Sequence, residues 1–169
     1  LMLLKQRFQD IKFITCHIDP IAMDRSIKPG MKMQEQFYSV LDKSDLSENC
    51  INLVGNKLLL SDKNEFREIL KAVGWRIKQM NDCKTFDEFN DMGKSRLNLV
   101  VAPFAKLAAE NMKRELDIPF LLAFTSYDMD IIEENYRKTF TAIEIELPDL
   151  GDYHNRTIKK IKETVNHLK

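Results

Sequence analysis

The sequence is poor in the residues that several common binding sites require. Its 169 residues include five glycines, and neither G-x-G-x-x-G nor G-x-x-x-x-G-K-[ST] occurs, so the two usual phosphate-binding loops are excluded. The three cysteines are far apart and odd in number, and no C-x-x-C or H-x-x-x-H spacing is present. They predict neither a disulfide framework nor a metal site. The G-x-S-x-G turn of the serine hydrolases is missing as well.

Charge of one sign and long apolar runs are also missing. The 26 basic residues balance 26 acidic ones without a basic block, which predicts neither nucleic acid nor an anionic membrane surface as a partner. No apolar run approaches the length of a transmembrane helix, and Leu1–Gln9 lacks the apolar core of a signal peptide. Because the cysteines also predict no disulfides, we expect a cytoplasmic protein.

Apolar segments of the kind that form a buried sheet are present, and they alternate with helical ones. Leu97–Ala102 and Phe120–Phe124 are almost continuously apolar, as strands covered on both faces are. Between them, apolar residues recur at helical spacing from Phe104 to Leu116. This order predicts two parallel strands joined by a crossover helix.

Further helices and strands are predicted on both sides of this unit. Capping boxes that pair Asp62 with Glu65 and Thr85 with Glu88 predict two helix starts, and Asp128 predicts a third. Gly74 is placed where a helix ends in a left-handed residue. The remaining predicted elements are a helix at Met31–Leu41, a polar helix at Thr157–Leu168, and strands at Ile11–Cys16, Cys50–Val54 and Trp75–Met80.

Strands and helices that alternate in this way predict an α/β fold. The expected architecture is a Rossmann-like, doubly wound parallel sheet in three layers, α/β/α. Cys50–Val54, Leu97–Ala102 and Phe120–Phe124 are expected to be central because they are almost continuously apolar. Trp75–Met80 contains several polar residues and is expected nearer an edge.

Two segments resemble a known family in their amino-acid motifs as well as in the spacing of their apolar residues. Leu97-Asn-Leu-Val, followed by a turn, a helix and Ile118-Pro, and the earlier Ile51-Asn-Leu-Val-Gly-Asn resemble the central domain of nitrogenase component 1 proteins. The resemblance implies that residues 1–169 are a single α/β domain, the middle domain of a longer nitrogenase-like chain. Its flanking helices are expected at about 1–10 and 151–169.

The segment Thr141–Leu147 has two interpretations. Its apolar and acidic residues alternate, which is typical of a strand. The family resemblance implies instead that the preceding helix continues through it. Sequence alone leaves both open.

The resemblance also carries implications for function. It implies a domain of a nitrogenase component 1-like oxidoreductase or of a cofactor-biosynthesis scaffold, working with a paired subunit and an ATP-dependent iron–sulfur reductase. In the family's molybdenum–iron protein, a cysteine after the central strand ligates the cofactor, and the matching position in this sequence is Ala102. We therefore expect this segment alone to be inactive and to bind no cluster, with an iron–sulfur or metal cofactor open for the full-length protein. Composition and periodicity fit equally well a non-catalytic Rossmann-like module that binds a small ligand or contacts a subunit.

Candidate site residues lie in the loops that follow the predicted strands. Parallel sheets bind ligands outside the carboxyl ends of their strands, where helix N-termini favour anionic groups. No metal-binding set and no catalytic residue is assigned. Cys16 and His17 carry the strongest ligand atoms of these loops, although a cysteine that ends a strand is more often simply buried. The full set of candidate cofactor-binding residues is Cys16, His17, Asp19, Pro103, Phe104, Ser126 and Tyr127.

Overall fold

The computed structural model describes residues 2–15 and 27–167, and its core is a four-stranded parallel sheet. Each strand pairs in parallel with its neighbours, in the spatial order β2-β1-β3-β4. Ile51 lies opposite Ile77 on one side and Leu97 on the other. The prediction of a parallel sheet is confirmed. The strands are β1 (Glu48–Val54), β2 (Arg76–Lys78), β3 (Ser95–Val100) and β4 (Phe120–Leu122).

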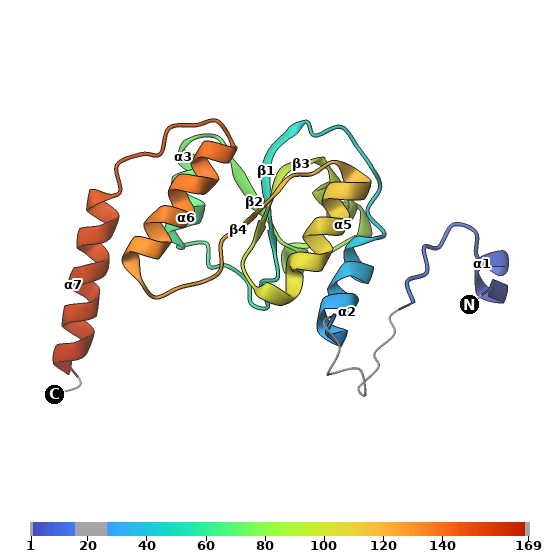
Figure 1. The fold of residues 1–169 in the computed structure, drawn as a ribbon, viewed down its shortest axis with the longest axis horizontal. Helices are drawn as coiled ribbons and strands as arrows, with labels where there is room; N and C mark the ends of the chain where they lie inside the picture. The colour runs from blue at the N-terminus through green and yellow to red at the C-terminus, as the bar shows by residue number, and fades with distance from the viewer. Residues whose placement is uncertain (1, 16–26, 168–169) are drawn as a thin grey trace.

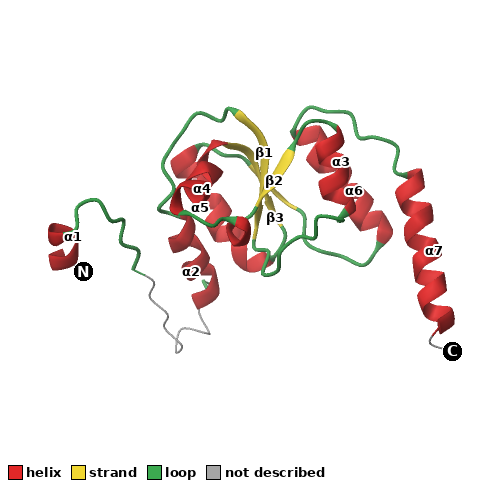
Figure 2. Cartoon of the chain, turned by 180° about the vertical axis from the view of Figure 1, so that it is seen from behind, coloured by secondary structure: helices red, strands yellow, loops and turns green. Residues whose placement is uncertain are grey.

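Helices cover both faces of this sheet and give the predicted three layers. Helices α3 and α6 lie on one face and α2 and α5 on the other, while α1 and α7 extend at opposite ends of the molecule (Figure 1). Seen from behind (Figure 2), α4 lies on the side of α2 and α5, where its Phe89 packs against the core. None of the helices in the described parts of the chain is long and apolar enough to cross a membrane. The helices are α1 (Met2–Arg7), α2 (Pro29–Tyr38), α3 (Glu65–Ala72), α4 (Phe86–Asn90), α5 (Lys106–Leu116), α6 (Met129–Ala142) and α7 (Gly151–His167).

Each face of the sheet has its own apolar core. Alternate residues of a strand point to opposite faces, so Leu53 and Leu99 join the core under α3 and α6. Val54 and Val100 join the core under α2 and α5. The continuous apolar runs of β1 and β3 therefore reflect burial on both faces, as expected.

The position of β4 differs from the prediction. β4 pairs only with β3 and forms an edge of the sheet, whereas Phe120–Phe124 was expected to be central. Its apolar residues are covered only in part, because Phe120 packs against the core under α5 while 41% of Leu122 is exposed. The apolar character of this segment therefore reflects partial burial under the helices on the two faces of the sheet. It does not show that the strand has neighbours on both sides.

The predicted first strand is also absent from the part of it that the structure describes. Ile11–Thr15, the described part of the predicted strand Ile11–Cys16, has irregular backbone. Lys12 lies in this segment and its Nζ donates to the carboxylate of Asp42 and to the carbonyl of Val40. Short apolar runs do not form strands unless a sheet edge receives them.

Both predicted capping boxes need correction, although one of the two predicted helix starts is confirmed. The N-cap of α3 is Asn64, because its side chain accepts from the amides of the first turn, so the predicted capping box of Asp62 is wrong. Thr85 caps α4 as predicted, but the carboxylate of Glu88 accepts from the amide of Lys84 and not from that of Thr85.

Two other helix ends are as predicted, and a third tests the two interpretations of Thr141–Leu147. Asp128 caps α6, and Gly74 ends α3 with a φ of 78°, both as predicted. Helix α6 ends at Ala142, and Glu144 has a left-handed φ of 59°. Residues 144–150 are neither strand nor helix, so both interpretations of Thr141–Leu147 are wrong for most of its length.

Candidate functional site

The sheet has a topological switch point between β1 and β3. The chain leaves β1 towards α3 on one face and leaves β3 towards α5 on the other, so the two turns diverge above the carboxyl ends of adjacent strands. Gly55 has a φ of 91°, and a Cβ on it would lie 2.7 Å from the Cβ of Ala105 and 3.3 Å from that of Ala102. Only glycine allows this contact between the turns.

A cavity opens at this edge on the side of α3 and α6. It has a volume of about 320 Å³, near the lower end of the range for small-molecule sites. We call it the α6 cavity. Strand residues form its floor, the turn after β4 and one side of α6 form one wall, and the start of α3 forms the other. Its lining residues are Leu53, Asn56, Leu60, Asn64, Glu65, Phe66, Leu99, Val101, Ala123, Phe124, Thr125, Ser126, Ile132, Asn135, Tyr136 and Thr139.

A second cavity opens at the same edge on the side of α2. This α2 cavity has a volume of about 460 Å³ and shares Asn56 with the α6 cavity. The Nζ of Lys57 lies 5.2 Å above the ring of Phe104, within range of a cation–π contact. The lining residues are Gly30, Met33, Gln34, Asn56, Lys57, Met80, Asn81 and Phe104.

Asn56 is held between the two cavities by a buried glutamine at the end of β2. The Nδ2 of Asn56 donates to the Oε1 of Gln79 over 2.8 Å. The Nε2 of Gln79 donates to Asp82, which also accepts from Arg67 of α3. Because Gln79 is almost fully buried, these bonds fix its side chain and with it the turn after β1.

The α6 cavity contains one hydrogen-bonded acid. The hydroxyl of Tyr136 donates to the Oε1 of Glu65 over 2.9 Å, and its ring stacks on Phe66 with centroids 4.9 Å apart. Burial, followed by the charge of Glu65 and this hydrogen bond, raises the pKa of Tyr136 well above its ordinary value. Tyr136 is therefore a neutral donor at physiological pH.

Two helix N-termini at this edge, those of α3 and α6, are capped by side chains. The Oδ1 of Asn64 accepts from the amides of Phe66 and Arg67 at the start of α3. The Oδ1 of Asp128 accepts from the amides of Asp130 and Ile131 at the start of α6. Side chains of the protein thus use the amides that an anionic ligand would need.

The candidate residues from the sequence fall into separate places. Phe104 lines the α2 cavity and Ser126 lines the α6 cavity, so the structure does not bring these two together. Pro103 is exposed at the start of a single 3-10 turn, and Tyr127 is fully exposed and lines neither cavity. The remaining candidates, Cys16, His17 and Asp19, lie outside the described residues.

The residues that define the α6 cavity were not predicted as site residues, because their sequence patterns have ordinary structural explanations. Glu65 was assigned to a capping box, and Tyr136 is one apolar position among several on its helix. The expectation that ligands bind beyond the carboxyl ends of strands does point to Asn56, after β1, and to Gln79, after β2. The pairing of Glu65 with Tyr136 joins residues 71 positions apart, so only the fold reveals it.

The described cysteines do not suit a metallocofactor. An iron–sulfur cluster is held by several thiolates. Burial raises the pKa of both Cys50 and Cys83, which disfavours the thiolate form. Cys50 lies near the opposite end of β1, and Cys83 is hydrogen-bonded to the carbonyl of Gln79. Within residues 2–15 and 27–167, no three His, Cys, Asp or Glu side chains are placed to hold a metal ion.

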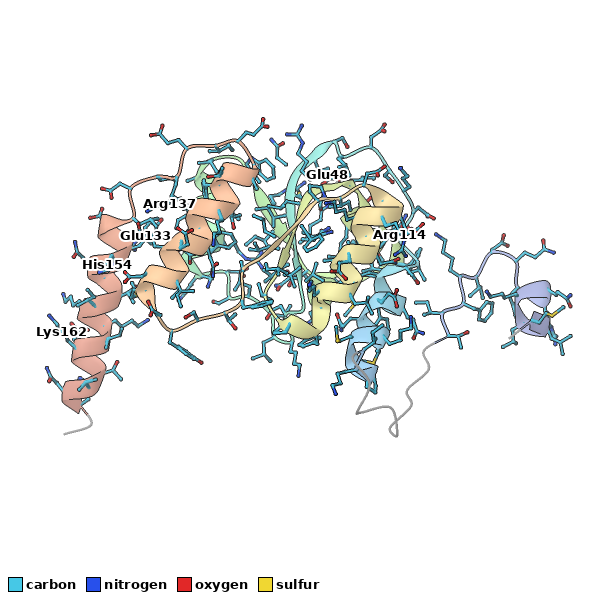
Figure 3. All side chains as sticks on the ribbon, viewed as in Figure 1. Glu48, Arg114, Glu133, Arg137, His154 and Lys162 are labelled. Carbon is cyan, nitrogen blue, oxygen red and sulfur yellow. The ribbon has the colours of Figure 1, made fainter. Side chains whose placement is uncertain are left out.

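A narrow cleft between α6 and α7 adjoins the α6 cavity. Glu133 of α6 and His154 of α7, both labelled in Figure 3, line this cleft together with Glu65 and Tyr136. Its volume is only about 30 Å³. Glu65 therefore lies between the cavity and the surface.

Comparison with known proteins identifies the family of this chain. No match is found among curated proteins. A solved structure described as "Nitrogenase Cp1 at pH 6.5" matches with a TM-score of 0.59 and 16% identity over 78% of this chain, which shows a shared fold. The chain covers 33% of the length of that structure's chain. The model of the family "Nitrogenase component 1 type Oxidoreductase" matches residues 7–169, and the chain therefore belongs to the nitrogenase component 1 type oxidoreductases.

Proposed function

We propose that this chain is the middle domain of a nitrogenase component 1-like reductase and that the α6 cavity forms one wall of its ligand pocket. The observation that carries the proposal is an apolar cavity of about 320 Å³ at the carboxyl edge of a parallel sheet, beside the switch point. The ligand is the organic part of a substrate or cofactor, since most of the lining is carbon.

The other parts of the reductase follow from family membership. We propose a paired subunit and an ATP-dependent iron–sulfur reductase as partners, and the cytoplasm as the compartment. The free thiols of Cys50 and Cys83 suit a reducing compartment. Any metal ligands come from outside the described residues, because Ala102 has no lone pair for a metal and no three His, Cys, Asp or Glu side chains among the described residues are placed to hold one.

Blocking the mouth of the α6 cavity tests the proposal in the complete parent protein. Thr125 is exposed and lines the cavity, so Thr125→Trp fills its mouth without entering the core. Ala142→Trp adds a matched indole at the exposed end of α6, away from both cavities. Both variants are assayed for ATP-dependent reduction of acetylene and of a porphyrin, and for the cofactor that copurifies.

We expect Thr125→Trp to lose most of the activity and Ala142→Trp to retain it. Full activity and full cofactor content in Thr125→Trp would rule the cavity out as a ligand wall. The alternatives are a cofactor-biosynthesis scaffold and a non-catalytic module. Copurifying cofactor without reduction of either substrate in the unmodified parent favours the scaffold, and neither cofactor nor reduction favours the non-catalytic module.

The isolated chain gives an independent check on where the cofactor is held. Clusters need several thiolates, and the three cysteines of this chain are at unrelated spacings. Anaerobic reconstitution followed by iron and sulfide analysis is expected to give no stoichiometric cluster. A stoichiometric cluster would show that this segment holds the cofactor itself.

A further inference from the structure

The α6 cavity has an unusual charge for the edge of a Rossmann-like sheet. Glu65 is the only acid among the described residues that line it, and those residues include no lysine, arginine or histidine. The other titratable group, Tyr136, is held neutral because its pKa is raised by burial and by Glu65. A ligand in the cavity therefore meets a single negative charge.

Glu65 takes part in no ion pair of the described residues. Its Oε1 accepts from Tyr136, and none of the ion pairs in the described parts of the chain includes it. Lys63, Arg156 and Lys160 line a separate cleft beside α7 that Glu65 also borders, and they are farther from it than an ion pair requires. Within the described residues, Tyr136 is the hydrogen-bond donor to this carboxylate.

The rest of the cavity is largely apolar and aromatic. Phe66 and Tyr136 both line it, and their rings stack on each other with centroids 4.9 Å apart and an interplanar angle of 15°. Leu53, Leu99 and Val101 complete the apolar surface from the sheet. Apolar and aromatic walls with few polar groups are typical of sites for small organic ligands.

Anionic ligands meet no positively charged side chain among the described residues that line this cavity. Two of the first amides of α3 and two of α6 are bound by Asn64 and Asp128, which leaves fewer of them for a phosphate or carboxylate. A second negative charge beside Glu65 in a half-enclosed apolar site is unfavourable. Nucleotides, the usual ligands of Rossmann-like edges, are therefore a poor match.

We propose that the α6 cavity binds a ligand with an apolar ring body and a cationic amine, with the amine donating to Glu65 and the ring against Phe66 and Tyr136. This rests on the proposed function only in using the same cavity as the ligand site. It adds the charge and the chemical class of the ligand.

Three probes that share one ring and differ in charge test the proposal on the 169-residue chain. Benzylamine, benzyl alcohol and benzoate are titrated against the ¹⁵N-labelled protein, with amide shifts of cavity residues as the readout. We expect benzylamine to bind about tenfold or more tightly than benzoate, the ratio given by one hydrogen bond between charged groups. Benzyl alcohol is expected between the two.

Two matched variants assign the preference to one carboxylate. Glu65→Gln keeps an acceptor for Tyr136 and removes the charge, so the preference for benzylamine over benzoate should disappear. Glu68→Gln removes a charge one turn later on α3, where the side chain is exposed and borders the outer cleft only, and should keep the preference.

The outcomes separate this inference from the proposed function. Equal binding of all three probes, or a preference that survives Glu65→Gln, overturns the charge assignment and leaves the cavity as the ligand site. If no probe shifts the cavity residues at any concentration up to solubility, this inference fails and the cavity loses its support as a ligand wall.

Discussion

The two faces of the sheet are packed in different ways. Under α2 and α5, small residues of the helix let it approach the sheet closely, and Ala105, Ala108 and Ala109 are completely buried. Under α3 and α6, large side chains such as Phe66 and Tyr136 hold the helices apart, and the α6 cavity remains. The close packing of α5 on the sheet fixes the switch point, whereas a cavity remains beside α6 and another lies farther out, between the start of α2 and Phe104.

Gly55 is where the closely packed face should be most sensitive. Gly55→Ala combines a left-handed φ with a Cβ 2.7 Å from that of Ala105, so we expect it to reduce the free energy of unfolding by about 3 kcal/mol. Gly74→Ala is the control, since Gly74 has a similar φ but no atom within 4 Å of a Cβ, and should cost only about 1 kcal/mol. Urea unfolding measures both. Equal losses would show that the contact between the turns is not close.

The second prediction concerns a buried polar pair on the same face. The Nδ2 of Asn52 donates to the Oδ1 of Asn98 and to the carbonyl of Met92, and its Oδ1 accepts from Ser95. Asn52→Leu removes the bonds to the buried side chains of Asn98 and Ser95, while the carbonyl of Met92 keeps its bond from the amide of Ser95, and the change should cost about 2 kcal/mol.

A double variant is the control for this pair. The Nδ2 of Asn98 already lacks a partner, so Asn52→Leu combined with Asn98→Leu removes unsatisfied groups as well as satisfied ones. By urea unfolding, the double variant should be more stable than Asn52→Leu alone. A double variant that loses the sum of both single effects would contradict the account of the pair as one network.

How far the sequence predicts the two faces depends on the range of the interactions involved. Continuous apolar strands such as Leu97–Ala102 predicted the parallel sheet, because burial on both faces determines every residue of a strand. The sequence motifs around Leu97 and Ile51 also indicated the family that the comparison shows. These signals are local.

The errors in the prediction arise where distant residues decide the outcome. Phe120–Phe124 has the composition of a central strand, but strand order depends on which partners are available, and β4 lies at an edge. The cap of α3 was assigned two residues early. Because Asn64 caps the helix, the Glu65 side chain is free to bind Tyr136, which is 71 residues away. The cavity and its charge therefore could not be predicted from local patterns.

The third prediction compares one tyrosine from each face. Burial, with a smaller contribution from Cys83, raises the pKa of Tyr38, the last residue of α2, and burial and Glu65 raise the pKa of Tyr136 in α6. A pKa raised by folding means that the unfolded chain loses its proton first. Stability is therefore fully present below the ordinary pKa of about 10 and falls as the pH rises above it, by at most about 1.4 kcal/mol per pH unit for each tyrosine.

Replacing each tyrosine separates the two faces in this alkaline range. Tyr38→Phe and Tyr136→Phe should each reduce the loss of stability between pH 9.5 and about 11.5, measured by urea unfolding at several pH values. Tyr127→Phe, at a fully exposed position, should leave the slope unchanged. A slope that neither buried variant alters would mean that both hydroxyls ionise freely in the folded protein.

The smallest predicted effect uses two neighbouring valines that point to opposite faces. Val100 is completely buried in the closely packed core, so Val100→Ile adds a methylene where no space exists and should cost about 1 kcal/mol. Val101 lines the α6 cavity, so Val101→Ile adds the same group to empty space and should stabilise the fold by about 0.5 kcal/mol. The two variants have the same composition and adjacent positions, so the sign of the difference reports only the packing of each face. Thermal and urea unfolding should agree on that sign. If both variants lose stability equally, the α6 face is packed as closely as the other and the space assigned to a ligand does not exist in solution.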